Sequence, residues 1–163
     1  MHALFDEWLN LAKHIGTVCI ADKRVITGAE SCTGGLIAAV LTSVSGSSAW
    51  VDRAFVTYSN EAKMQILGVA SATLDVFGAV SEETAREMAI GALKNSRATM
   101  AYAVTGVAGP SGGTLTKPVG MVCFGFVTAQ DVTSVTKHFS GDRSAVREQS
   151  VNFVLEQLSR ATI

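Results

Sequence analysis

Three short polar segments contain the residues of this sequence that could carry out chemistry. The first, Gly28–Gly35, reads Gly-Ala-Glu-Ser-Cys-Thr-Gly-Gly and lies between a predicted strand and a predicted helix. Small residues let backbone N–H groups approach a ligand there, and a helix N-terminus carries about half a positive charge. The position therefore suits a phosphate, or an oxyanion formed when Ser31 attacks an acyl group. Equally, Ser31 or Thr33 can simply cap the helix.

The second segment, Thr57–Lys63, places a lysine near a helix start. If Asn60 is the N-cap, Lys63 lies in the first turn, where the helix dipole disfavours a cation by about 0.3–1 kcal/mol and lowers the lysine pKa. A neutral lysine can take a proton from a serine hydroxyl, and Tyr58 can relay the proton or orient either partner. The alternative is a solvated lysine that pairs with Glu61.

The third segment, Thr105–Thr114, is a glycine-rich loop that follows a predicted strand. Its N–H groups can surround a phosphate or a ribose, although it matches neither the P-loop nor the G-x-G-x-x-G pattern. A flexible connection is equally open, but the twelve residues from 106 to 117 are long for a mere connector. Arg143, which opens the last predicted helix, is either a solvated surface residue or an anion ligand.

Hydrophobic periodicity places these segments at the ends of predicted strands. Apolar residues recur at helical spacing from Leu4 to Cys19, and alternating or continuous apolar runs mark the strands. The pattern predicts strands over 24–30, 53–58, 101–105, 119–128 and 132–139, and helices over 4–19, 36–41, 60–67, 82–93 and from about 142 onward. Alternating helices and strands followed by a hairpin predict an α/β fold, a single domain with a mixed β-sheet flanked by helices on both faces.

Composition narrows the possible classes of protein. The 163 residues fit one domain over 1–163, and a charged fraction of only 17% favours a homo-oligomer that buries some apolar surface. With 13 basic and 14 acidic residues and no basic run, we expect no nucleic-acid partner. The longest apolar run has nine residues, so we expect no membrane span. Three distant cysteines and a start without a signal-peptide pattern indicate a cytoplasmic location, and no histidine spacing indicates a metal.

Five motifs occur in an order that is typical of one protein family. They are Ala29–Gly35, Gly46–Ser48, Val56–Lys63, Gly78–Glu83 and Thr105–Pro110. Together they closely resemble the CinA carboxy-terminal domain family, the bacterial nicotinamide-nucleotide amidohydrolases, from about residue 24 to residue 153. Each motif alone is weak, whereas five collinear motifs are specific. The chain resembles the stand-alone form, without the pyrophosphatase-type domain that many family members carry.

The resemblance implies that the chain converts nicotinamide mononucleotide and water to nicotinate mononucleotide and ammonia, with no metal and no organic cofactor. It assigns Ser31 as the nucleophile, Lys63 as the base and Tyr58 as their helper. The residues that we expect to bind the oxyanion, or the ribose and phosphate of the substrate, are Thr33, Gly34, Gly35, Thr105, Gly106, Gly109 and Arg143.

Two other functions stay open on the sequence. The chain can be a catalytically silent, nucleotide-binding regulatory module of the same fold. It can also be an interaction protein that docks a partner on its apolar first helix through Leu4, Trp8 and Leu11. The intact set of Ser31, Tyr58 and Lys63 favours the enzyme over both.

Overall fold

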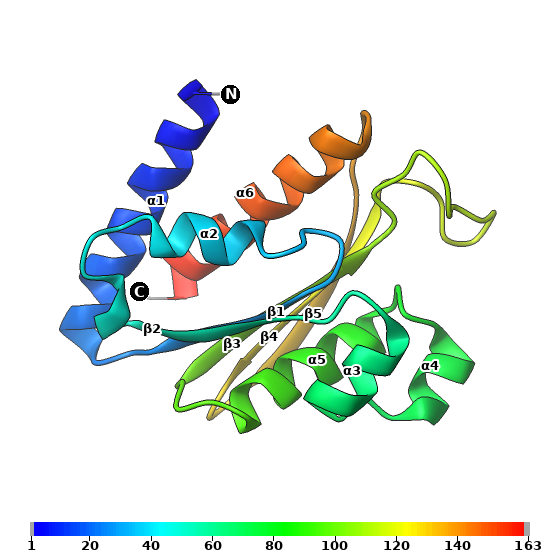
Figure 1. Cartoon of the computed structure of the whole chain (residues 1–163), viewed down its shortest axis with the longest axis horizontal. Coiled ribbons are helices and arrows are strands. Elements are labelled where there is room, and N and C mark those ends of the chain that lie inside the picture. The colour runs from blue at the N-terminus through cyan, green and yellow to red at the C-terminus, as the bar shows by residue number, and fades with distance from the viewer. Residues whose placement is uncertain (1, 162–163) are drawn as a thin grey trace.

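The computed structural model describes residues 2–161, in which a five-stranded mixed sheet lies between two layers of helices (Figure 1). The strand order is β2-β1-β3-β4-β5, and the predicted α/β fold is confirmed. The strands are β1 (Ile26–Glu30), β2 (Val51–Val56), β3 (Met100–Gly106), β4 (Met121–Thr128) and β5 (Val132–His138). The helices are α1 (His2–Asp22), α2 (Leu36–Thr42), α3 (Asn60–Leu67), α4 (Ser71–Phe77), α5 (Glu82–Lys94) and α6 (Arg143–Ala161), with a 3-10 turn η1 (Ser47–Ala49).

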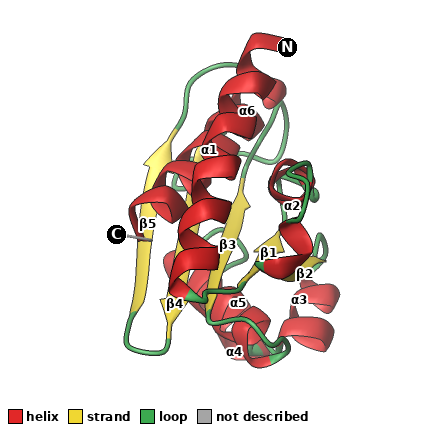
Figure 2. Ribbon diagram, turned by 90° about the vertical axis from the view of Figure 1, so that its left-hand side faces the viewer, coloured by secondary structure: helices red, strands yellow, loops and turns green. Residues whose placement is uncertain are grey.

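The two faces of the sheet are covered by different helices and differ in the size of the side chains that pack there. Helices α1, α2 and α6 cover one face, and α3, α4 and α5 cover the other (Figures 1 and 2). The first face is filled by large side chains, among them Trp8, Ile15, Trp50, Phe124 and Leu155. Small side chains on the second face, such as Ala101 and Ala103, let α5 lie close to the sheet. Gly125 is needed for this approach, because a Cβ there would lie 2.5 Å from the Ala85 carbonyl oxygen.

The parallel strands bring the predicted site segments to one edge of the sheet. From β1 the chain reaches β2 through α2 on one face, and it then reaches β3, on the other side of β1, through helices on the opposite face. β1 is parallel to both neighbours, and Glu30 pairs with Val56 on one side and Val104 on the other. The carboxyl ends of β1, β2 and β3 therefore meet at a topological switch point, where α/β sheets commonly bind ligands.

Some local predictions were wrong. Helix α4 was not predicted, because none of its seven residues is buried and it lacks an apolar stripe. Ser59, and not Asn60, caps α3, since the Ser59 side chain accepts a hydrogen bond from the Ala62 N–H. Strand β2 spans 51–56 in place of 53–58, so Tyr58 lies beyond its end. The glycine-rich loop after β3 is longer than predicted and runs from 107 to 120.

Two further observations concern membrane-spanning helices and the state of the cysteines. In the part of the chain that the structure describes, no helix combines the length and the apolarity needed to cross a bilayer. The three cysteines, Cys19, Cys32 and Cys123, are free thiols and are buried.

Candidate active site

Ser31 and Lys63 meet at the carboxyl end of β1. Ser31 directly follows this strand. Lys63 comes later in the chain, after β2, in the first turn of α3. Lys63 Nζ donates a hydrogen bond to Ser31 Oγ at 3.1 Å and another to the Thr57 carbonyl oxygen at 2.9 Å. An amine this close to a serine hydroxyl can accept the hydroxyl proton when the amine is neutral. The fold thus joins two residues that the sequence separates by 32 positions.

Burial disfavours the charged form of Lys63. The residue is only 1% exposed, and the removal of its amine from water lowers its pKa, with a smaller opposing effect from the nearby Cys32. No carboxylate of residues 2–161 forms a salt bridge with Lys63. The alternative of a solvated lysine paired with Glu61 is therefore wrong.

The turn presents a serine hydroxyl and a cysteine thiol in different environments. Ser31 is 8% exposed, and its hydroxyl contacts the lysine amine. Burial raises the pKa of the Cys32 thiol to about 12, so this thiol stays protonated and unreactive at neutral pH.

The buried carboxylate of Glu30 holds the turn that carries Ser31. Glu30 is completely buried at the end of β1. It accepts five hydrogen bonds, from Thr33 Oγ1 at 2.7 Å, Gly35 N at 3.2 Å, Ile37 N at 3.1 Å, Ala38 N at 2.9 Å and Tyr102 Oη at 3.1 Å. A side chain of the protein therefore occupies the amino end of α2. The predicted capping of this helix by Ser31 or Thr33 is wrong, since the Thr33 hydroxyl serves Glu30.

The N–H groups of the turn divide into engaged and free ones. Gly34 N donates to the Ser31 carbonyl oxygen at 3.0 Å, and Gly35 N donates to Glu30. These two N–H groups, which we expected to face a ligand, already have acceptors. The N–H groups of Cys32 and Thr33 donate no hydrogen bond to any other residue within 2–161, although the Cys32 N–H faces its own thiol. Of the predicted donors in this turn, only Thr33 has a free N–H group.

Arg147 on α6 supports the same turn from the other side. Its Nε donates to the Cys32 carbonyl oxygen and its Nη2 to the Thr33 carbonyl oxygen, each at 3.2 Å. Because the N–H and C=O of a peptide point in opposite directions, these bonds also fix the direction of the Thr33 N–H. Glu30 thus holds the turn by accepting from an N–H group of the turn, and Arg147 holds it by donating to two carbonyl oxygens of the turn.

Tyr58 and Arg143 form a second polar pair near this edge. Tyr58 is 63% exposed, and its hydroxyl accepts a hydrogen bond from Arg143 Nη2 at 3.1 Å. Arg143 Nη1 donates to the Gly109 carbonyl oxygen at 2.9 Å. Three predicted site residues therefore come together from three segments. Within residues 2–161, no hydrogen bond joins Tyr58 to Ser31 or Lys63, and its role as their helper stays a prediction.

Thr105 and Gly106 form the end of β3, beside the start of the Ser31 turn. The hydroxyl of Thr105 and the lack of a side chain at Gly106 both have structural reasons. The buried Thr105 hydroxyl donates to the Ala79 carbonyl oxygen at 2.8 Å. A Cβ at Gly106 would lie 2.7 Å from Val122 Cγ2, so strand packing requires glycine there. A role for their backbone in binding stays a prediction.

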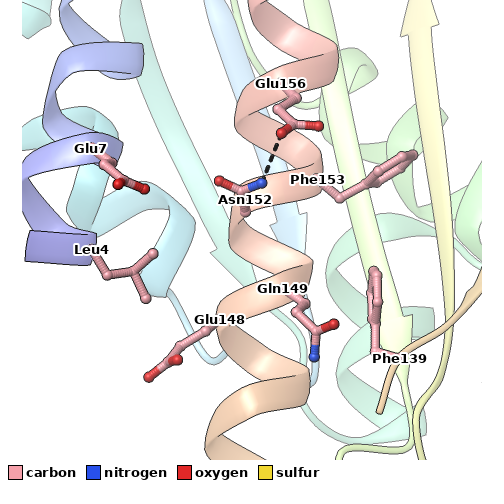
Figure 3. Close-up of a pocket in the computed structure, with 8 residues that line it drawn as sticks. All are labelled: Leu4, Glu7, Phe139, Glu148, Gln149, Asn152, Phe153 and Glu156. Carbon is pink, nitrogen blue, oxygen red and sulfur yellow. Dashed lines mark hydrogen bonds between the residues drawn. The ribbon is translucent and has the colours of Figure 1, made fainter. Parts of the chain in front are cut away.

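A groove of about 460 Å³ on another part of the surface is separate from these residues (Figure 3). It extends over α6, with Leu4 and Glu7 of α1 at one end and Phe153 and Phe139 on the side of α6 remote from α1. None of its lining residues belongs to the predicted site. The part of the chain that the structure describes also brings no three His, Cys, Asp or Glu side chains close enough to share a metal ion.

Sequence reasoning missed Glu30 and Arg147. For Glu30 a signal was present, because an acidic residue ends a strand that is otherwise apolar or small, and a buried carboxylate needs several donors. For Arg147 no local signal exists, since its contacts lie more than a hundred residues away in the chain.

Comparison with known proteins gives consistent matches along the chain. The profile of the CinA C-terminal domain matches residues 9–162. A protein of Escherichia coli (strain K12) named "Nicotinamide-nucleotide amidohydrolase PncC" is 51% identical over 155 residues, which cover 94% of this chain and 93% of that protein. The protein of the same name from Shigella flexneri is 50% identical over 154 residues, with coverage of 94% and 93%.

A solved structure extends the match to three dimensions. The crystal structure of competence/damage inducible protein CihA from Agrobacterium tumefaciens superposes with a TM-score of 0.91 and is 46% identical in sequence. The superposition covers 95% of this chain and 94% of that one.

Proposed function

This chain belongs to the CinA C-terminal domain family, and from that premise we propose that it hydrolyses the carboxamide of nicotinamide mononucleotide. The products are nicotinate mononucleotide and ammonia. The observation that carries the proposal is the 3.1 Å contact between Ser31 Oγ and the buried amine of Lys63. The curated relatives named as amidohydrolases supply the substrate, and the contact supplies a means of attack on it.

The first half of the reaction forms an acyl-enzyme. Neutral Lys63 takes the Ser31 hydroxyl proton while Ser31 Oγ bonds to the carboxamide carbon, and the C=O electron pair moves to oxygen. The tetrahedral intermediate then collapses, the C–N bond breaks, and the protonated Lys63 gives its proton to the leaving nitrogen. Ammonia departs and leaves the acyl group as an ester on Ser31.

The second half returns the enzyme to its starting state. Water loses a proton to Lys63 and attacks the ester carbon, and Lys63 returns that proton to Ser31 Oγ as the ester bond breaks. The carboxylic acid product ionises and leaves as nicotinate mononucleotide. Lys63 thus moves one proton in each half, which requires an amine that is neutral at rest, as its burial favours.

The free N–H groups of Cys32 and Thr33 are our candidates for the oxyanion donors. They belong to the two residues that follow Ser31, and the N–H groups of Gly34 and Gly35 are already engaged. In acyl transfer, the N–H of the residue after a nucleophile commonly points at the developing oxyanion. Removal of one such donor typically lowers turnover by about 10²–10³.

The remaining predicted residues suit the nucleotide part of the substrate. Arg143 supplies a cation beside the loop 107–120, and its contacts with Tyr58 and Gly109 hold it at the site's edge. We propose that Arg143 and this loop bind the ribose and 5′-phosphate, and that Tyr58 orients the reacting groups once substrate is bound. We also propose a homo-oligomer, because Ile66, Val76, Phe77 and Ile90 expose apolar surface on the α3–α5 layer.

The decisive experiment measures ammonia released from nicotinamide mononucleotide, in the presence of a chelator, by the wild type and by Lys63→Met. Turnover that survives the chelator and is lost in the variant would support a lysine-dependent amidohydrolase. If no ammonia appears but the nucleotide raises the melting temperature, the chain is a binding module of the same fold. If ammonia is not released and the nucleotide does not raise the melting temperature, both functions are rejected.

A further inference from the structure

We propose that Glu30 is the positioning residue of this site: its carboxylate orients the turn 31–35 so that the reacting carbonyl meets the N–H groups of Cys32 and Thr33 and not those of α2. The inference rests on the proposed function, since it concerns how Ser31 is presented to a carboxamide. Glu30 itself touches neither Ser31 Oγ nor Lys63 through any hydrogen bond within residues 2–161.

The first argument is the number and spread of the bonds to Glu30. One oxygen accepts from the Thr33 hydroxyl and two backbone N–H groups, and the other accepts from Ala38 N and Tyr102. Hydrogen bonds to an ionised group are about twice as strong as neutral ones. Because the donors come from the turn, from α2 and from β3, the carboxylate ties all three together directly behind Ser31.

The second argument is that Tyr102 prevents the carboxylate from moving. Tyr102 is completely buried, and a Cβ at Gly28 would lie only 2.0 Å from its Cζ, so the ring sits against a bare backbone. Burial, with the Glu30 charge beside it, raises the pKa of Tyr102 well above its usual range, so the hydroxyl remains a donor. Because the Tyr102 hydroxyl cannot move, it fixes the orientation of the Glu30 carboxylate. The carboxylate in turn fixes the orientation of the turn through its bonds to Thr33 and Gly35.

A consequence for substrate binding follows from the same contacts. The N–H groups at the amino end of α2 all have acceptors: those of Gly35, Ile37 and Ala38 donate to Glu30, which also places a negative charge there, and that of Leu36 donates to the Thr33 carbonyl oxygen. A substrate phosphate is therefore repelled from a helix end that would otherwise attract it. Arg147 is already bonded to the carbonyls of the turn, so Arg143 at the edge of the site is the cation that we propose for the phosphate, with the carboxamide end of the nucleotide directed toward Ser31.

The chain contains a matched control for a carboxylate that only caps a helix. Glu87 on α5 accepts hydrogen bonds from Ala70 N at 2.8 Å and from the Thr73 hydroxyl, at the start of α4. Like Glu30 it accepts hydrogen bonds at the start of a seven-residue helix, but its hydrogen bonds hold α4 and none of them involves the turn that carries Ser31. Glu87→Gln should therefore lower stability without affecting turnover.

The test compares Glu30→Gln with Glu87→Gln. Glutamine keeps the size of Glu30 and one accepting oxygen, but its NH₂ cannot accept from Ala38 N. Tyr102 can reverse its hydroxyl and accept from the NH₂, so the loss is limited to the charge and one acceptor. We expect Glu30→Gln to lower kcat at least tenfold, with KM within about threefold, and both variants to melt a few degrees below the wild type.

A second readout does not depend on the natural substrate. The rate at which a fluorophosphonate labels Ser31, followed by mass spectrometry, should fall about tenfold in Glu30→Gln and stay unchanged in Glu87→Gln. If Glu30→Gln does not fold, Tyr102→Phe removes a single donor from the carboxylate and should slow labelling severalfold.

The outcomes separate this inference from the proposed function. Wild-type labelling and turnover in Glu30→Gln, with only a lower melting temperature, would make Glu30 a helix cap and overturn the inference. A raised KM with unchanged kcat would overturn it too, because positioning of the nucleophile acts on kcat. Wild-type protein that is labelled but releases no ammonia would overturn the proposed substrate, while the labelling rates would still decide the role of Glu30.

Discussion

Replacing Ser31 and Lys63 singly and together tests whether the two residues act as one unit. Ser31→Ala removes the attacking hydroxyl, and Lys63→Met keeps an unbranched side chain of similar length without the amine. Lys63 Nζ lies 3.1 Å from Ser31 Oγ, and in the proposed mechanism both residues take part in the same proton transfer. Once either is gone, the other has nothing left to contribute to that step.

The expected magnitudes follow from that dependence. A general base contributes about 10²–10⁴ to a rate. We therefore expect each single change to lower kcat by about 10³, which corresponds to about 4 kcal/mol of transition-state stabilisation. Two independent contributions would multiply to about 10⁶, whereas a coupled pair leaves the double variant near 10³.

The assay is ammonia release at saturating nicotinamide mononucleotide, with each variant measured well below its melting temperature. Lys94→Met is the matched control, because Lys94 is an exposed lysine at the end of α5 and its loss should leave kcat unchanged. Circular dichroism melting curves show whether each variant is folded under the assay conditions.

Two results would refute the reasoning. A double variant whose loss equals the product of the single losses would show that Ser31 and Lys63 act in different steps. Wild-type kcat in folded Lys63→Met would show that the buried amine is not the base at all, whatever its distance from Ser31.

Three further predictions concern titration and buried polar groups. Because burial lowers the pKa of Lys63, kcat/KM should rise with pH along a limb whose midpoint lies below the ordinary lysine value of 10.5, and a midpoint at or above that value would contradict this. The hydrogen bond from Arg53 lowers the pKa of Asp52 from 3.8 to about 2. Asp52 therefore stabilises the fold above pH 3.8, and this contribution is lost as the pH falls toward 2; Asp52→Asn should remove that part of an acid unfolding curve followed by circular dichroism, and an unchanged curve would count against it. The Thr57 hydroxyl is buried without a partner in residues 2–161, so Thr57→Val should stabilise the protein by about 1 kcal/mol, and a lower melting temperature would show that the hydroxyl has a use.

Local patterns were sufficient to predict most of the secondary structure. The stripe from Leu4 to Cys19 predicts α1, and Ser81 followed by two acids predicts the start of α5, where its side chain indeed accepts from Thr84 N. Such signals are contained in one segment, since periodicity and capping involve residues three or four apart. Helix α4 escaped because it buries no residue, and the cap of α3 was displaced by one position because serine and asparagine are comparable N-caps.

The sequence by itself determined which segments are candidates for chemistry, because serine, lysine and glycine at the ends of strands can be recognised one segment at a time. The tertiary structure alone decided which of them meet. Parallel pairing of β1 with β2 and β3 brings Lys63 to Ser31, and α6 brings Arg143 to Tyr58 across 85 positions of sequence. It also decided that Glu30, and not a ligand, occupies the amino end of α2. Strand register and burial are properties of the packed chain, so no local pattern contains the distance between two segments or the loss of water that lowers the pKa of Lys63.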